Sequence, residues 1–89
     1  MSSIQNAGSF RQAIVTKFIP PGNVKGARVK AQADAGSVTI PWDYSQGIQE
    51  NHSLAAMALV ERYNWGGAWV GGIVFNQGYV FVQVPDDKT

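Results

Sequence analysis

Hydrophobic positions recur with a helical period in one stretch, from Glu50 to Trp65 (ENHSLAAMALVERYNW). Successive side chains in a helix are 100° apart, so residues can be assigned to opposite sides. One side gathers His52, Ala56, Leu59, Val60 and Tyr63, and the other gathers Glu50, Asn51, Ala58, Glu61 and Arg62. Leu54 is the exception, because it falls in the polar half. The pattern predicts an amphipathic helix that rests on a sheet.

The sequence predicts one position for the end of this helix and two alternatives for its start. Gly66-Gly67 predicts the stop, because glycine adopts the left-handed cap conformation without a Cβ clash. Ser45 and Asn51 are alternative N-caps, so the first turn begins between Gln46 and His52.

Alternating residues before the helix predict three strands. The first runs from about Gln12 to Phe18, with Ile14 and Phe18 on the face opposite Lys17, and Pro20-Pro21-Gly22-Asn23 ends it. A second strand, Ala27 to Ala33, and a third, Ser37 to Ile40, flank a hairpin turn at residues 34–36. The small residues Ala27, Ala31 and Ala33 predict close approach of the helix.

Two more strands follow the helix. The first, Ala68 to Phe75, contains Gly71-Gly72, which indicates a bulge, a bend or close contact with another backbone. A turn at Asn76-Gln77-Gly78 leads into the last strand, Tyr79 to Val84. Here Val80, Val82 and Val84 share one face, and Tyr79, Phe81 and Gln83 share the other.

The resulting order, βββαββ, predicts an α+β fold with an antiparallel sheet of about five strands and one helix packed on one face. The chain of 89 residues has room for one core. We expect a flexible N-terminus at 1–9, a single domain at 10–85 and a C-terminal tail at 86–89.

The composition favours a cytoplasmic protein. The chain has no cysteine, which fits a reducing compartment. No apolar run approaches the roughly 20 residues of a membrane span, and the N-terminus lacks the features of a signal peptide.

The chemistry of the sequence argues against an enzyme, a cofactor and a metal site. His52 is the only histidine, and we expect it to be half-buried and bonded to backbone. Acid–base catalysis would need a partner, for which Asp43 is the candidate. The carboxylates are scattered, and the glycines near Trp65 match no phosphate loop.

Charge is distributed unevenly along the chain. Residues 1–33 hold five cations and no acid, and residues 34–89 hold six acids and two cations, giving +5 and −4. The early cations are Arg11, Lys17, Lys25, Arg28 and Lys30. This asymmetry has two interpretations: an edge that faces a polyanion, or charges that only keep two strands soluble.

A nucleic-acid interface is the leading functional prediction. If the first two strands are adjacent, Lys17, Arg28 and Lys30 share one sheet face, and Lys25 lies at the loop rim. Tyr79 or Phe81 would stack bases on that face, with Trp42 and Tyr44 at its margin. The alternative for these aromatics is core filling, which we expect for Trp69 and Phe75.

The competing prediction is a protein–protein inhibitor or adaptor, such as an anti-defence protein, that uses the same face against a host protein. Aromatic residues and arginine anchor protein interfaces. An exposed edge strand also allows pairing with a second copy, which would give a homodimer.

Residues 13–65 carry a resemblance. They combine a start with Thr-Lys, the strand GARVKA, the strand end SVTIP and an alanine-rich helix that closes on Trp65. This combination resembles a group of small uncharacterised proteins encoded on bacterial plasmids and phages. The resemblance implies a mobile-element accessory protein that acts by direct binding to nucleic acid or host defence machinery, and it implies no particular site residues.

Overall fold

The computed structural model describes residues 13–74 and 78–84. Five strands and one helix follow in the order β1 (Ala13–Ile19), β2 (Arg28–Ala33), β3 (Gly36–Pro41), α2 (Ile48–Arg62), β4 (Trp69–Val74) and β5 (Gly78–Gln83). The predictions for the termini at 1–9 and 86–89, for Phe75 and for the turn residues Asn76 and Gln77 lie outside the described residues.

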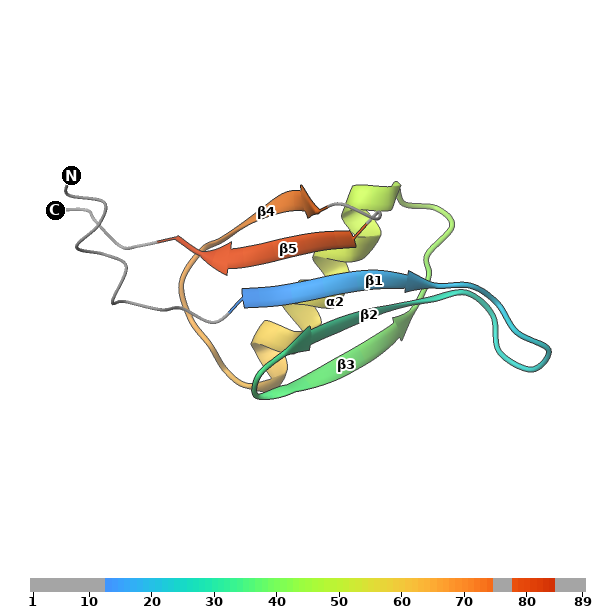
Figure 1. Ribbon diagram of the computed structural model, residues 1–89, viewed down its shortest axis with the longest axis horizontal. Coiled ribbons are helices and arrows are strands. Elements are labelled where there is room, and N and C mark those ends of the chain that lie inside the picture. Colours follow the sequence, from blue (N-terminus) through green and yellow to red (C-terminus); the bar gives the residue numbers. More distant parts are fainter. Residues whose placement is uncertain (1–12, 75–77, 85–89) are drawn as a thin grey trace, which may run out of the picture.

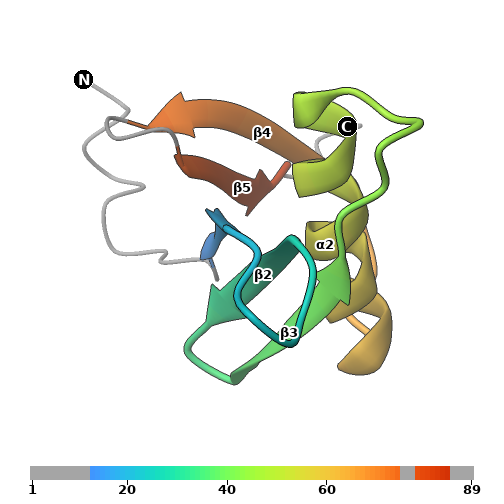
Figure 2. The ribbon, with the colours of Figure 1, turned by 90° about the vertical axis from the view of Figure 1, so that its right-hand side faces the viewer.

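The strands form one antiparallel sheet in the order β3-β2-β1-β5-β4 (Figure 1). The helix lies on one side of this sheet, mainly against β2 and also against β1 and β3 (Figure 2). The predicted α+β class, the βββαββ order and the helix on one face are confirmed. The first turns of α2 reach β5, where the His52 and Tyr79 rings are 4.3 Å apart, but the helix makes its main contacts with β1, β2 and β3.

The strand register assigns each side chain to a side of the sheet. Ile14 is paired with Phe81, and Thr16 with both Ala31 and Tyr79. These residues face α2, and we call their side of the sheet the helix side. The alternate positions form the open side, which holds Val15, Lys17, Ile19, Arg28, Lys30, Val70, Val80 and Val82.

The core lies where α2 crosses β1 and β2. Ile14, Val29 and Leu59 are fully buried there. Ala31 on β2 and both Ala55 and Ala56 on α2 are also fully buried. Alanines on both elements let the helix axis approach the sheet closely, as the sequence predicted.

The helix begins within the predicted range, but its cap is neither Ser45 nor Asn51. Gly47 is the N-cap residue, and no side chain caps the first turn. Asn51 was assigned to the polar side, yet it is fully buried. Its Oδ1 accepts from the Asp43 amide at 2.7 Å, and its Nδ2 donates to the Asp43 and Gly47 carbonyls at 3.0 and 2.9 Å. Asn51 is buried because it ties the loop before the helix to the first turn.

The helix also ends earlier than Gly66-Gly67. Asn64 has a φ of 57° and occupies the left-handed position. The Trp65 amide donates to the Val60 carbonyl at 3.0 Å, and the Asn64 amide donates to the Glu61 carbonyl at 3.1 Å. These two bonds form a Schellman cap, in which asparagine serves in place of glycine.

Close contact explains Gly71 in β4, with a side-chain ring where another backbone was predicted, whereas a Cβ on Gly72 would meet nothing within 4 Å. The β4–β5 register is continuous from Trp69 to Val74, which excludes a bulge. A Cβ on Gly71 would lie 2.6 Å from a ring atom of Phe81. The absence of a side chain at Gly71 therefore makes room for the Phe81 ring. No helix in the described part of the chain is long and apolar enough to cross a membrane.

Candidate functional site

Three cations of the sequence prediction share the open side of the sheet. Lys17 on β1 lies directly opposite Lys30 on β2. Arg28 precedes Lys30 by two residues on the same strand, so it points to the same side, and it pairs with Ile19. The predicted common face for Lys17, Arg28 and Lys30 is confirmed.

The pairing of Lys17 with Lys30 is electrostatically unfavourable in the isolated protein. Cβ atoms of directly opposed residues in an antiparallel pair are roughly 4.5–5.5 Å apart, and like charges there destabilise the sheet. No acidic residue offsets them on the described open side. Asp34 lies in the β2–β3 turn, Asp43 in the loop before α2, and Glu50 and Glu61 on α2. The open side is therefore the cationic side of the molecule.

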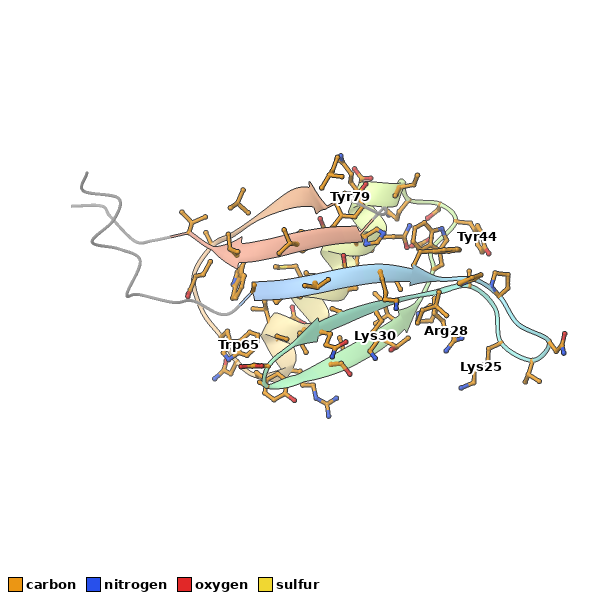
Figure 3. The ribbon with its side chains drawn as sticks, in the orientation of Figure 1. Lys25, Arg28, Lys30, Tyr44, Trp65 and Tyr79 are labelled. Atoms are coloured by element: carbon orange, nitrogen blue, oxygen red, sulfur yellow. The ribbon has the colours of Figure 1, made fainter. Side chains whose placement is uncertain are left out.

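Lys25 adds a fourth cation at the rim. It lies in the loop between β1 and β2, which projects from one end of the sheet beyond Arg28 (Figures 1 and 3). The Gly22 amide donates to the Lys25 carbonyl at 2.8 Å, which closes the loop on itself. Val24 at its tip is 92% exposed. The loop holds Lys25 away from the body of the protein, where a long ligand can reach it.

Tyr79 and Phe81 do not lie with these cations. The register pairs Phe81 with Ile14 and Tyr79 with Thr16, both of which face α2. Phe81 is buried in the core, and Tyr79 packs against it. The interpretation that placed both rings on the basic face is wrong, because β5 alternates in the opposite phase and presents Val80 and Val82 there. The core-filling alternative holds for Phe81, and Trp69 also packs against the core as expected.

The open side has an apolar half next to its cationic half. Val80 pairs with Val15 between β5 and β1, and Val82 pairs with Val70 between β5 and β4. Val15, Val70 and Val82 are 50%, 53% and 39% exposed. The open side thus changes from valines over β4 and β5 to cations over β1 and β2.

A second feature, which the sequence did not predict, is a groove on the helix side. Its volume is about 500 Å³. It lies between the start of α2 and the β5–β4 strands, and its lining residues are Phe18, Trp42, Ile48, His52, Ile73 and Tyr79. We call it the aromatic groove. It exists because α2 covers the β1–β3 part of the sheet and leaves the helix side of β5 and β4 partly free.

The aromatic rings of the groove meet mostly edge to face. The Phe18 and Trp42 rings are 4.9 Å apart at 81°, and those of Trp42 and His52 are 5.9 Å apart at 84°. The His52 and Tyr79 rings are 4.3 Å apart, tilted by 39°. The sequence signal for this cluster was that Phe18 alternates in phase with Ile14, and that Trp42 follows directly where β3 ends.

His52 forms the buried floor of the groove. It is 1% exposed, and its Nδ1 lies 2.6 Å from the Thr16 hydroxyl. The expected half-buried histidine bonded to backbone is therefore wrong on both points, because β1 supplies a hydroxyl beneath the helix. Desolvation by burial lowers the pKa of His52 below its ordinary value of 6.5, which favours the neutral ring.

Asp43 does not serve as a partner of His52. Its carboxylate accepts from the Ser45 hydroxyl at 2.6 Å and from the Ser45 amide at 2.9 Å. These bonds lower the pKa of Asp43 and direct its carboxylate to a local turn. Among the described residues, no group of three histidine, cysteine or acidic side chains is arranged to hold a metal ion.

Comparisons of the chain with protein-family models, curated proteins and solved structures found no match. The cations of the open side and the aromatic groove are therefore the two features of the described residues that bear on function.

Proposed function

We propose that this protein binds nucleic acid through the cationic half of its open side, without catalysing a reaction. Lys17, Lys30, Arg28 and Lys25 contact backbone phosphates. Such contacts depend on charge and carry no direct sequence information. The affinity is therefore sensitive to salt, and the phosphate contacts do not distinguish one base sequence from another.

The observation that carries this proposal is the direct opposition of Lys17 and Lys30 on a side without described acidic residues. Two like charges held side by side cost stability in the free protein. A phosphate between them removes the repulsion and forms charge-assisted hydrogen bonds. Arg28 and Lys25 continue the positive strip toward the end of the sheet, which suits a chain of phosphates better than one isolated anion.

The test is a titration of labelled single- and double-stranded oligonucleotides at several salt concentrations. For single strands, the logarithm of the binding constant falls with the logarithm of salt by about 0.7 per neutralised phosphate. Three to four contacts therefore give a slope of about −2 to −3. Failure to bind either oligonucleotide at low salt would overturn the proposal.

Matched variants locate the interface. Arg28→Gln removes a cation of the open side, whereas Arg62→Gln removes a cation at the last turn of α2, where its guanidinium lies 5.9 Å from the Tyr63 ring centroid. Arg28→Gln is expected to reduce the magnitude of the salt slope by about 0.7. Arg62→Gln is expected to leave it unchanged. Equal effects of the two substitutions would place the phosphates elsewhere.

The valines of the open side favour a second candidate function, an inhibitor or adaptor that binds a host protein. Val15, Val70 and Val82 form an exposed apolar surface beside the cations, and protein interfaces have an apolar centre with a polar rim. Substitution of Val70 by Asp separates the two functions. It would abolish capture of a protein partner, such as a host defence component, and leave the salt slope for oligonucleotides in place.

The biological setting that suits both candidates is a cytoplasmic accessory protein of a plasmid or phage. The resemblance of residues 13–65 to proteins of such elements supports this setting. A homodimer through the edge strands β3 or β4 is compatible with either function, because neither edge occupies the cationic half of β1 and β2.

A further inference from the structure

The aromatic groove and the cations lie at the same end of the sheet. The labelled side chains of Tyr79 and Tyr44 lie near that end, from which the loop bearing Lys25 projects (Figure 3). Lys17 directly precedes Phe18, so consecutive residues of β1 serve the open side and the groove. The Trp42 amide donates to the Ala27 carbonyl at 3.0 Å, which holds Trp42 next to the strand that carries Arg28. A flexible polyanion at the cations is therefore close to the mouth of the groove.

His52 presents a polar group to this largely apolar groove. The Nδ1 atom lies 2.6 Å from the Thr16 hydroxyl, which also lies 3.5 Å from the Tyr79 carbonyl. A neutral imidazole has one N–H donor and one acceptor nitrogen, so Nε2 has the role that Nδ1 does not take. Within the described part of the chain, Nε2 has no hydrogen-bond partner, although the residue is 99% buried and lines the groove. The residues that line the groove thus carry three polar groups on their rings: the His52 imidazole, the Trp42 indole N–H and the Tyr79 hydroxyl.

We propose that the aromatic groove receives one unpaired base of a single-stranded nucleic acid whose phosphates lie on the cationic half of the open side. The inference rests on the proposed function. Phe18, Trp42 and Tyr79 supply the ring contacts, and His52 Nε2 forms a hydrogen bond with the base edge. Ile48 and Ile73, which are 62% and 71% exposed, form the apolar rim and lose water when the base enters.

The chemistry of the groove selects a base over other occupants. Its walls are aromatic, its few polar groups belong to rings, and its volume of about 500 Å³ lies within the range of small-ligand sites. Planar rings stack on aromatic side chains in a sequence-tolerant way. Bases in a duplex are already stacked and paired, so the groove predicts a preference for single strands.

The experiment compares two single-stranded oligonucleotides of equal length and charge, an oligothymidine and a version with abasic sites throughout. We expect about tenfold tighter binding of the oligothymidine at the same salt concentration, because stacking adds to the phosphate contacts. Equal binding of the two would overturn this inference and leave the proposed function standing. No binding of either would overturn both.

Substitutions in the aromatic groove test whether its rings cause the tighter binding of the oligothymidine. Phe18→Leu and Tyr79→Leu keep apolar volume and remove a stacking surface, and each is expected to reduce the preference for bases toward unity without changing binding of the abasic strand. Leu54→Ala is the control, since Leu54 is 45% exposed on α2 and does not line the groove. A preference that survives both groove variants would show that the base binds elsewhere and would overturn the assignment.

Discussion

The hydrogen bond between Thr16 and His52 connects the middle of the sheet to the helix. Both residues are buried, and the bond joins side chains 36 positions apart. A buried polar group is costly when its partner is removed, more than the bond itself contributes. We therefore expect the loss of either partner to reduce the stability of the fold.

Thr16→Val removes the hydroxyl with little change in shape and leaves Nδ1 of His52 without its partner. We expect a loss of about 1–3 kcal/mol in the free energy of unfolding, measured by urea denaturation. Thr16→Ser keeps the hydroxyl and serves as the control for the bond. A valine variant as stable as the parent would show that the bond contributes nothing.

The low pKa of His52 makes stability depend on pH. Above about pH 6.5 the ring is neutral in both the folded and the unfolded chain, so it adds no pH dependence. Below that pH the unfolded chain takes up a proton that the folded protein resists. The free energy of unfolding therefore falls with decreasing pH, by at most ~1.4 kcal/mol per unit, until the folded pKa is reached.

Urea denaturation between pH 7.5 and 5 checks this dependence. His52→Gln lacks the titrating ring and is expected to show a flatter profile over the same range. The contribution of Asp43, whose pKa is lowered from 3.8 by bonds to Ser45, is lost only at lower pH and does not overlap. A flat profile for the parent protein would contradict the account of His52.

At the residue scale, the sequence predicted which neighbours share a face better than it predicted which polar residues are buried. The alternation of apolar and polar residues correctly placed Lys17 and Ile14 on opposite sides of the sheet. It could not show that Asn51 is buried, because its bonds to Asp43 and Gly47 depend on how the loop before α2 folds back.

The local pattern of the sequence predicted each helix and strand, but it did not predict the residues that cap the helix. All five strands and the helix were expected within a few residues of their observed bounds. The helix stop was assigned to Gly66-Gly67, but Asn64 forms the cap because asparagine also tolerates the left-handed region. The sequence also could not show which residues of β5 share a side of the sheet with those of β1. That depends on the register between strands far apart in the chain.

Substitutions at Asn64 test the cap. Asn64→Ala keeps the Cβ at a φ of 57° but removes the short polar side chain that lets asparagine tolerate the left-handed region, and we expect a loss of about 1 kcal/mol in the free energy of unfolding. Asn64→Gly relieves the same constraint and is expected to match or exceed the parent. Thermal or urea denaturation of both variants measures the difference. An alanine variant as stable as the glycine variant would contradict the assignment of the Schellman cap.

The whole molecule separates its charges by side. The described acidic residues lie on α2 and the loops, and Lys17, Arg28 and Lys30 lie on the open side. Part of this was predictable, because alternation and the adjacency of the first two strands place the cations together. The aromatic groove was not, because it depends on how far α2 extends over the sheet.

The opposition of Lys17 and Lys30 predicts a conflict between stability and binding. Lys30→Glu turns a repulsive cross-strand pair into an attractive one, and we expect the free energy of unfolding to rise by about 0.2–1 kcal/mol. The same change is expected to weaken oligonucleotide binding at low salt. Lys30→Gln, which removes charge without reversing it, should lie between. A variant that loses stability and binding together would indicate a structural role for Lys30.

The most direct measurement is the map of amide chemical-shift changes when a single-stranded oligonucleotide is added to labelled protein at low salt. We expect the changes to gather on β1, β2 and the loop that bears Lys25, to reach the aromatic groove at Phe18 and His52, and to spare the last turns of α2. Changes confined to the valines of β4 and β5, or to the far end of the helix, would contradict a nucleic-acid interface on the cationic half of the open side.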